Sequence, residues 1–303
     1  MNTLTKQLQN FLEMNKDKEV TPAAVARVLD VPVPPNRQME FDCPMHGHRL
    51  FTTYMRNDGT WLEPYCDECA SLAARRQEII AEIQKDVKDL HKDLRNILEL
   101  ETPPLWFDAS FDSFVTETVE QAEVLRRCKK FADEFLDREV QREMARRRGQ
   151  KNYCTINRWG IGLQGNYGTG KTHLAIAIAK RTKELGIPAL YLRAMDLFPV
   201  LASCERDVSV NSVMAKLCRI PCLILDELGR HSWTDFQKNL LFRLIDSRMN
   251  NGRPVIVITN LNFGELTQLV DGAVIDRFKQ TIVGMAFPWE SMRGRFTTFD
   301  GGF

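Results

Sequence analysis

The sequence predicts an α/β fold, because strand-like and helix-like segments alternate over residues 102–303. Such alternation favours a parallel sheet with flanking helices. Two further observations concern the residues in front of it. Residues 41–70 contain closely spaced cysteines and histidines, and residues 71–101 are charged with apolar residues at helical spacing. We therefore expect four parts: an N-terminal helical segment over 1–40, a small zinc-ribbon-like module, a helical linker and the α/β domain.

The N-terminal segment, residues 1–40, shows helical signals. Leu4 and Leu8 fall on one helical face. Thr21 followed by Pro22 is typical of a helix start, since proline is favoured at the first helical position. A proline-rich stretch comes next and must be extended. We expect this segment to belong to a partner-docking surface or to the local fold.

The composition is that of an ordinary globular protein. Of the 303 residues, 44% are hydrophobic and 27% are charged, and the formal net charge of +1 gives no global signal for nucleic acid. No apolar run approaches the ~18 residues that span a bilayer. The first residues lack the basic and apolar parts of a signal peptide. We therefore expect no membrane association, a cytoplasmic location and reduced cysteines.

Two pairs of metal-ligand residues occur in the small module. Cys43 and His46 form the first pair, and Cys66 and Cys69 form the second. The stretch between them has hairpin character with Asp-Gly as the turn, and such a ribbon places both pairs around one tetrahedral ion. This pattern predicts a structural Zn²⁺ site that takes the place of a hydrophobic core. His48 is the alternate ligand, and reduced cysteines without a metal are the alternative interpretation.

The linker, residues 71–101, has the pattern of one long amphipathic helix. Its apolar residues recur at alternating four- and three-residue steps, namely Ile83, Val87, Leu90, Leu94 and Ile97. This spacing is typical of a helix with one apolar face and is compatible with a short coiled coil. The run Thr102-Pro103-Pro104 ends the helix and marks the boundary of the α/β domain.

A complete phosphate-binding loop, G-x-x-x-x-G-K-[ST], lies between a short apolar strand and a helix. The loop and the residue that follows it are Gly165, Asn166, Tyr167, Gly168, Thr169, Gly170, Lys171, Thr172 and His173. The glycines bring backbone N–H groups against phosphate oxygens, and the helix N-terminus favours an anion. Lys171 is suited to the β- and γ-phosphates of ATP, and the Thr172 hydroxyl is suited to Mg²⁺. A chance glycine-rich turn is disfavoured, because every position matches.

Two further apolar strands end in residues that complete an ATP-hydrolysing site. Asp226 and Glu227 follow the first of these strands, and Asn260 follows the second. Asp226 would hold Mg²⁺, and Glu227 would orient and polarise the attacking water. Asn260 would position that water near the γ-phosphate. The alternatives are two solvated acids at a strand end and an ordinary turn residue at Asn260.

These motifs resemble the AAA+ ATPases. Within that family, the strings Asp226-Glu227-Leu228-Gly229 and Thr259-Asn260-Leu261-Asn262 look most like the bacterial and phage replicative helicase loaders of the DnaC/DnaI type, with the transposon-encoded IstB ATPases as close relatives. The aromatic segment 105–114 is similar to the one that opens the family's ATPase domain near the adenine. The resemblance covers residues 105–296, and a zinc module in front of it is similar to the DnaI arrangement.

The resemblance implies roles for two arginines. Arg277 would be the arginine finger that reaches the γ-phosphate of a neighbouring subunit, where a guanidinium fork stabilises the transition state. Arg293 would be the second sensor, touching the γ-phosphate within the same subunit. A local ion pair with Asp276 is the alternative for Arg277, and Arg295 lies close enough in the sequence to take the place of Arg293.

The resemblance also implies partners. It predicts ATP-dependent loading of a hexameric replicative DNA helicase onto single-stranded DNA, with self-association promoted by ATP and with the zinc module gripping the helicase or DNA. A helical insertion over 196–219 would face the DNA, with Arg206, Lys216 and Arg219 as candidate phosphate contacts. An ordinary solvated surface is the alternative for these three residues. The basic cluster 146–148 is less specific. Rival functions are an IstB-like targeting subunit for a transposase and a non-enzymatic DNA-binding scaffold in which ATP is structural.

Overall fold

The computed structural model divides the chain into two compact units, Met1–Gln77 and Glu78–Phe303. The described residues are 36–43, 47–55, 59–61, 66–98, 107–156, 159–197, 210–229, 233–270 and 272–292. The predicted N-terminal helices and several predicted site residues lie outside these ranges, namely His46, Arg206, Arg293 and Arg295.

The first unit is built on an antiparallel hairpin. Its strands are β1 (Asn36–Cys43) and β2 (Gly47–Tyr54). Met55 and Trp61 form a second antiparallel bridge, which flanks the predicted Asp-Gly turn. Phe51 and Thr53 are buried, because alternate residues of a strand share one face. Residues 36–40 therefore differ from the predicted helical segment: their pairing with β2 makes them a strand.

A single long helix, α3 (Asp67–Ile97), begins in the first unit and ends in the second. It matches the predicted amphipathic helix. Ile83 and Leu94 are buried in the core of the second unit, so the apolar stripe packs into the α/β domain and does not serve a coiled coil. The compact second unit accordingly starts at Glu78, well before the boundary predicted at Thr102.

The second unit contains the predicted parallel sheet. Its strands are β3 (Gly160–Gly165), β4 (Leu190–Arg193), β5 (Leu223–Asp226), β6 (Val255–Thr259) and β7 (Ile282–Phe287). The order is β4-β5-β6-β3-β7, and neighbouring strands are parallel. Every residue of β5 and β6 is buried, as expected for strands covered on both faces. The strand order reverses next to β3, and ligands of parallel sheets bind at such a switch point.

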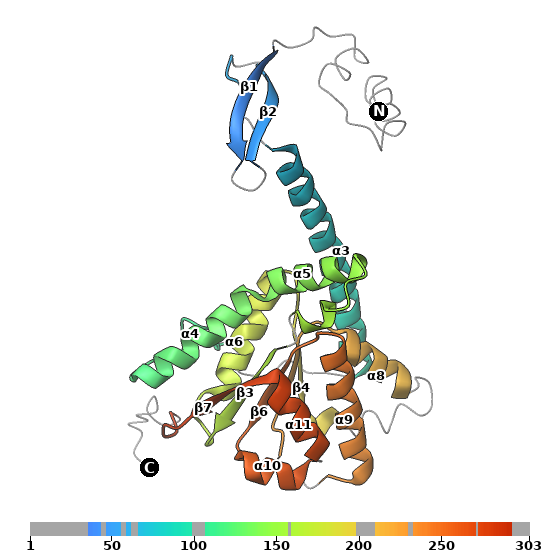
Figure 1. Ribbon diagram of the computed structural model, residues 1–303. Helices are drawn as coiled ribbons and strands as arrows, with labels where there is room; N and C mark the ends of the chain where they lie inside the picture. Colours follow the sequence, from blue (N-terminus) through green and yellow to red (C-terminus); the bar gives the residue numbers. More distant parts are fainter. Residues whose placement is uncertain are drawn as a thin grey trace. The chain divides into compact units, whose positions relative to one another are not determined.

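Helices cover both sides of this sheet in Figure 1, with α4 and α6 on one side and α8, α9 and α11 on the other. The helices are α4 (Val119–Asp133), α5 (Phe135–Arg147), η2 (Tyr153–Thr155), α6 (Lys171–Glu184), α8 (Val210–Arg219), α9 (Asp235–Asn250), α10 (Phe263–Leu269) and α11 (Gly272–Thr281). Thr118, Thr234 and Asn262 each begin a helix with a capping box, which satisfies backbone donors at the helix start. Among the described residues, none of the helices combines the length and apolar character needed to cross a bilayer.

Candidate nucleotide-binding site

The glycine-rich loop joins β3 to α6 at the carboxyl edge of the sheet, as predicted. Gly168 and Gly170 have φ angles of 76° and 90°, in the left-handed region that favours glycine. A Cβ on Gly170 would lie 2.6 Å from Cε2 of Phe114, and a Cβ on Gly165 would lie 2.5 Å from the carbonyl oxygen of Phe287. Glycine is therefore required at Gly165 and Gly170 both for the turn and for close packing against neighbouring segments.

Lys171 places its ammonium group inside this loop. The Nζ atom donates to the carbonyl oxygens of Gly165 at 2.8 Å and Asn166 at 2.6 Å, and the side chain is buried. Thr169 closes the loop by donating from Oγ1 to the same Asn166 carbonyl at 2.9 Å. A cation held at the N-terminus of α6 adds to the positive end of the helix dipole, so this loop has the donor set that a polyphosphate requires.

Asp226, the last residue of β5, connects the loop helix to the neighbouring strand. Its Oδ2 accepts hydrogen bonds from the Thr172 hydroxyl at 2.9 Å and from the Tyr191 hydroxyl at 2.7 Å. Burial raises the pKa of this carboxyl above its ordinary value, and the hydrogen bonds from Tyr191, the Glu227 backbone N–H and Thr172 oppose that shift. In P-loop enzymes, the hydroxyl of the loop threonine and a nearby carboxylate together hold Mg²⁺. Thr172 and Asp226 therefore fit a magnesium ion.

Glu227 has a φ of 57°, the one left-handed non-glycine residue in the described part of the chain. Such a conformation costs about 1–3 kcal/mol and persists where the surroundings impose it. Two hydrogen bonds impose it here. The Leu228 N–H donates to the Ile258 carbonyl at 3.0 Å, and the Thr259 hydroxyl donates to the Leu228 carbonyl at 2.6 Å. Because these bonds tie the end of β5 to the end of β6, Glu227 is held at the edge where the phosphate-binding loop lies.

Asn260 directly follows β6, which lies between β5 and β3 in the sheet. Thr259 is in register with Gln164 of β3, so Asn260 leaves the sheet beside the start of the phosphate-binding loop. The strand order therefore places Asn260 between the end of β5, at Asp226, and the end of β3, at Gly165. The water-positioning role of its side chain stays a prediction.

Two further segments contact the loop or the residue that follows it. The indole Nε1 of Trp289 donates to the Thr169 carbonyl at 3.0 Å, and the Met292 N–H donates to the Gly168 carbonyl at 2.9 Å. On the other segment, the Ser110 carbonyl lies 2.8 Å from Nε2 of His173. The aromatic segment was predicted near the adenine, and Met292 directly precedes the predicted sensor Arg293. No motif marks the contact of Trp289. His173 was predicted to bind the nucleotide, and the described contacts of its ring also include Phe114.

Arg277 lies on α11 and is paired within its own chain. Its Nε donates to Oδ1 of Asp246 on α9 at 2.8 Å, and its Nη1 lies 3.5 Å from Oδ2 of Asp276. The predicted alternative, an ion pair with Asp276, is thus the weaker of two intrachain contacts. The arginine-finger role stays a prediction.

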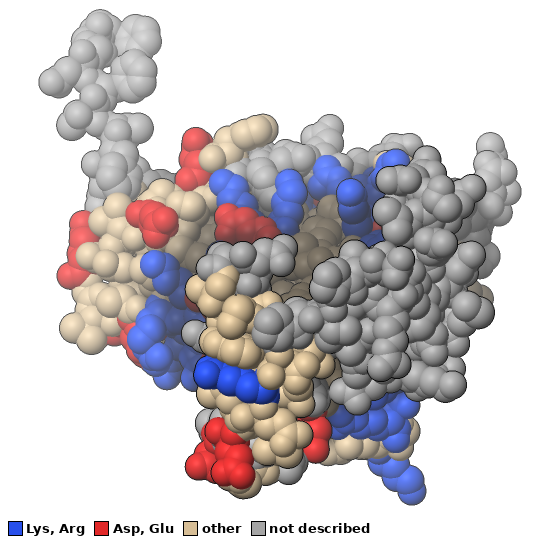
Figure 2. Space-filling view, turned by 90° about the horizontal axis from the view of Figure 1, so that it is seen from above, with Lys and Arg blue, Asp and Glu red and all other residues tan. Residues whose placement is uncertain are grey.

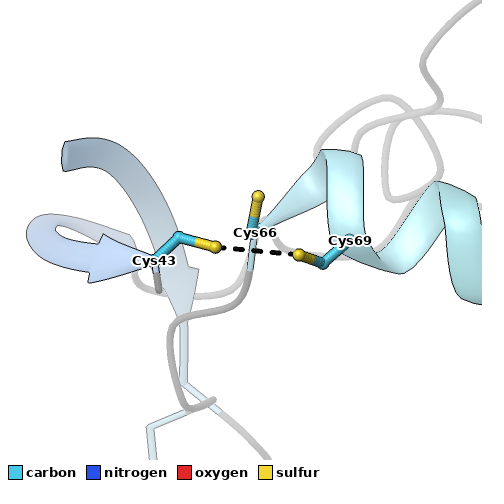
Figure 3. Close-up of side chains that lie close together, drawn as sticks. All are labelled: Cys43, Cys66 and Cys69. Atoms are coloured by element: carbon cyan, nitrogen blue, oxygen red, sulfur yellow. Dashed lines mark hydrogen bonds between the residues drawn. The ribbon is translucent and has the colours of Figure 1, made fainter. Parts of the chain in front are cut away.

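Three predicted zinc ligands lie together in the first unit. The Sγ atoms of Cys43, Cys66 and Cys69 are all within 4.8 Å of one another, and Figure 3 shows Cys43 at the end of the hairpin facing the two cysteines at the start of α3. The Cys43 and Cys69 sulfurs are 3.7 Å apart, within hydrogen-bonding distance for sulfur. This hydrogen bond, together with burial and the nearby Cys66, raises the pKa of Cys69 to about 11.

This cysteine cluster, Cys43, Cys66 and Cys69, fits a zinc ion, because three thiolates crowded together need a cation to offset their charge. The alternate ligand, His48, is not in the group: its Nδ1 lies 3.1 Å from Oδ1 of Asp42. The remaining cysteines that the structure describes do not join the cluster either.

The basic residues predicted to contact DNA are mostly ion-paired. Arg146 and Arg147 donate to Glu143, and Lys216 on α8 is paired with Asp93 of α3. These ion pairs hold helices together, and a contact of these cations with DNA stays a prediction. Arg219 remains exposed.

Comparisons with known proteins find several that are similar to this chain. Residues 152–295 match the model of the family described as IstB-like ATP binding protein. The chain is 25% identical over 197 residues to the replicative helicase loader DnaC of Escherichia coli (strain K12), which covers 64% of this chain and 73% of that protein. It is 36% identical over 105 residues to a protein of Sinorhizobium fredii (strain NBRC 101917 / NGR234) named as an insertion sequence ATP-binding protein, which covers 35% of each.

A crystal structure of the DnaC helicase loader matches the fold, with a TM-score of 0.51 and 22% identity over 61% of this chain and 99% of that chain. Together with the sheet order, this match confirms the predicted AAA+ fold. The predicted resemblance to DnaC-type loaders is also confirmed.

Proposed function

We propose that this protein is an ATP-hydrolysing, cytoplasmic loader that places a hexameric replicative DNA helicase onto single-stranded DNA. The observation that carries the proposal is the similarity to the E. coli replicative helicase loader, which spans 73% of that protein. The intact phosphate-binding loop and the Thr172–Asp226 contact support ATP as the energy source.

Different residues of the chain would have different roles in hydrolysis. Bound Mg²⁺ would neutralise charge that develops on the phosphates. Lys171 would turn from its loop carbonyls to phosphate oxygens, and Thr172 and Asp226 would hold the metal. Glu227 would orient and polarise the attacking water, with Asn260 positioning it.

A neighbouring subunit would complete this site. Arg277 would leave its pair with Asp246 and reach the γ-phosphate bound to the next subunit, and Arg293 would act within the same subunit. Self-association promoted by ATP follows, because each site needs a residue from the adjacent copy. The cysteine cluster, with His46, would hold a structural Zn²⁺ and keep the first unit rigid for gripping the helicase.

Co-elution with a hexameric replicative helicase on a sizing column tests the proposal. We expect one complex in the presence of ATP and loss of that complex when the chain is shortened to begin at Glu78. A chain beginning at Thr102 is unsuitable, because it lacks Ile83 and Leu94 of the ATPase core. Absence of a complex at every nucleotide condition would contradict the loader function.

A second candidate is an ATP-dependent targeting subunit for a transposase. It is favoured by the IstB-like family match and by the similarity to the insertion sequence protein. Affinity capture from a host that carries both partners separates the two functions. Recovery of a transposase without the helicase would establish the second candidate in place of the first.

A further inference from the structure

A basic groove lies beside the edge strand of the second unit, away from the phosphate-binding loop. It is a hollow of about 800 Å³ between α3, the end of α6 and β4. Its cationic lining residues are Lys85, Lys88, Lys92, Arg95 and Lys183, and none of its described lining residues is acidic. We call these five residues and the hollow the lysine groove.

The charges of α3 are sorted onto two flanks of the helix. Lys85, Lys88, Lys92 and Arg95 recur at three- and four-residue steps on one flank, and Glu82, Asp86, Asp89 and Asp93 do so on the other. The buried stripe with Ile83 and Leu94 lies between the two flanks on the side of the core. In the surface view of Figure 2, lysine and arginine side chains gather in patches and are not evenly spread.

The acidic flank has partners within the domain. Glu82 is paired with Arg147, and Asp93 with Lys216. On the basic flank, Lys85, Lys88 and Lys92 are exposed, and no ion pair is found for them within the described ranges. The acidic flank thus holds α3 against the domain through ion pairs. Lys85, Lys88 and Lys92 line the groove instead.

The groove has fixed walls. Gln84 donates to the Leu185 carbonyl at 2.8 Å, and Nε2 of His91 lies 3.2 Å from the Ala189 carbonyl. Burial lowers the pKa of His91, the hydrogen bond with the Ala189 carbonyl opposes this shift, and Arg95 and Lys183 lower the pKa further by repulsion. Pro188, Ala189 and Tyr191 add an apolar floor beneath the lysines.

We propose that the lysine groove binds the phosphodiester backbone of single-stranded DNA and reports its occupancy to the nucleotide site through Tyr191. Lys85 to Arg95 span about 15 Å along α3, enough to meet several phosphates of one strand. A positive rim with an apolar, partly aromatic floor suits phosphates and unpaired bases together. The inference rests on the proposed function for the identity of the polymer.

Tyr191 connects the groove to the proposed ATP site, because it contributes to both. Its side chain lines the groove, while its hydroxyl donates to Oδ2 of Asp226 at 2.7 Å. A strand that packs on this ring moves or fixes the hydroxyl, and the hydrogen bond transmits that change to the carboxylate predicted to hold Mg²⁺. Tyr191 is a positioning residue in this scheme.

Fluorescence anisotropy of a labelled 20-nucleotide oligo(dT), read over a series of salt concentrations, tests the binding. The double variant K88A/K92A should bind about 10-fold more weakly at low salt and lose about 1.4 from the salt slope, since each phosphate contact on a single strand contributes about 0.7. K88R/K92R should keep binding. K129A/K130A, which removes the same charge from α4, is the matched control and should match the wild type within about 2-fold.

Several results would overturn the proposal: an unchanged slope in K88A/K92A, no binding by the wild type, or equal competition by duplex DNA or inorganic polyphosphate. Loss of helicase co-elution in K88A/K92A with oligonucleotide binding intact would assign the groove to a protein and also overturn it. If the wild type fails to co-elute with the helicase while K88A/K92A loses DNA, the groove stands and the loader function falls.

The role of Tyr191 is read from the ratio of ATPase rates with and without the oligonucleotide. In Y191F this ratio should move toward 1 while oligonucleotide affinity is kept, because the ring stays and the hydroxyl is lost. An unchanged ratio in Y191F, whatever its absolute rate, would contradict the connection between groove and nucleotide site.

Discussion

The second unit, Glu78–Phe303, buries a continuous apolar core around its parallel sheet, whereas the described part of the first unit, Met1–Gln77, buries little beyond Phe51, Thr53 and cysteines. Burial of apolar surface is enough to hold a domain of the larger size. A two-stranded hairpin is marginal in water without further support. The second unit is therefore held by apolar packing, whereas the first unit depends, in the proposed account, on a metal bound by its cysteines.

α3 makes the comparison sharper, because one helix serves both units. Its first turn contributes Cys69 to the cysteine cluster, and its later turns place Leu94 in the core of the second unit. Substitutions on this helix should therefore act on one unit or the other, depending on where they fall.

The largest expected effect belongs to Lys171→Ala. Loss of the buried ammonium should abolish ATP turnover and weaken nucleotide binding at least about 100-fold, measured by phosphate release and by titration with a fluorescent ATP analogue. Bound zinc per chain should not change, since the metal belongs to the other unit. A fall in zinc content would show that the two units are not independent.

Arg277→Ala should affect turnover alone. If the guanidinium serves a neighbouring subunit, the ATPase rate should fall by about 10³-fold at saturating ATP while the Kd for ATP stays within about 2-fold. Asp246→Asn is the control, because it removes the intrachain partner and leaves the arginine. Unchanged turnover in Arg277→Ala would leave the residue with its structural ion pair only.

Removal of zinc should unfold the first unit selectively. A strong chelator or Cys66→Ser should abolish the chemical-shift dispersion of the hairpin, because the ligand bonds supply the folding free energy of a small metal-bound module. ATP turnover without helicase should remain. Cys128→Ser, at a buried thiol outside the cluster, controls for general cysteine loss, and intact hairpin signals after metal removal would contradict the zinc assignment.

Leu94→Ala tests which part of α3 packs into the core of the second unit. Truncation of this fully buried side chain should lower the free energy of unfolding of the second unit by about 2–5 kcal/mol. Leu72→Ala, on the same helix but 45% exposed in the first unit, should change it by less than about 0.5 kcal/mol. Urea unfolding followed by tryptophan fluorescence measures both, and equal effects would mean that the helix is not divided in this way.

The smallest effect on stability is expected from Glu143→Gln, and this effect should depend on pH. Burial would raise the pKa of Glu143, but hydrogen bonds from Arg146 and Arg147 outweigh it and lower the pKa from 4.5 to about 2. Because the folded pKa lies below the unfolded one, the stabilisation is present above about pH 4.5 and is lost as the pH falls toward 2. The variant should be roughly 2 kcal/mol less stable at pH 7, and this deficit should shrink in urea titrations below pH 4.5.

Sequence patterns predicted the parts of the molecule in which local chemistry decides the structure. The phosphate-binding loop, the strands before Asp226 and Asn260, the long helix and the clustered cysteines all have fixed spacings. The loop needs glycine at a left-handed φ, and only a few residue types bind phosphate or zinc, so these sites leave a readable signal.

The remaining features depend on contacts between residues far apart in the sequence. No pattern marks Trp289 as a donor to the Thr169 carbonyl, or Tyr191 as a donor to Asp226. The boundary at Glu78 was likewise missed, because an amphipathic stripe shows that a face is buried but not which unit covers it.

The most direct test of the central claim is helicase transfer onto a closed circle of single-stranded DNA with an annealed oligonucleotide. A hexameric helicase unwinds the oligonucleotide only after it encircles the strand. We predict that this protein with ATP raises the unwinding rate many-fold and that Lys171→Ala does not. Equal rates with and without the protein, or full stimulation by Lys171→Ala, would contradict ATP-dependent loading.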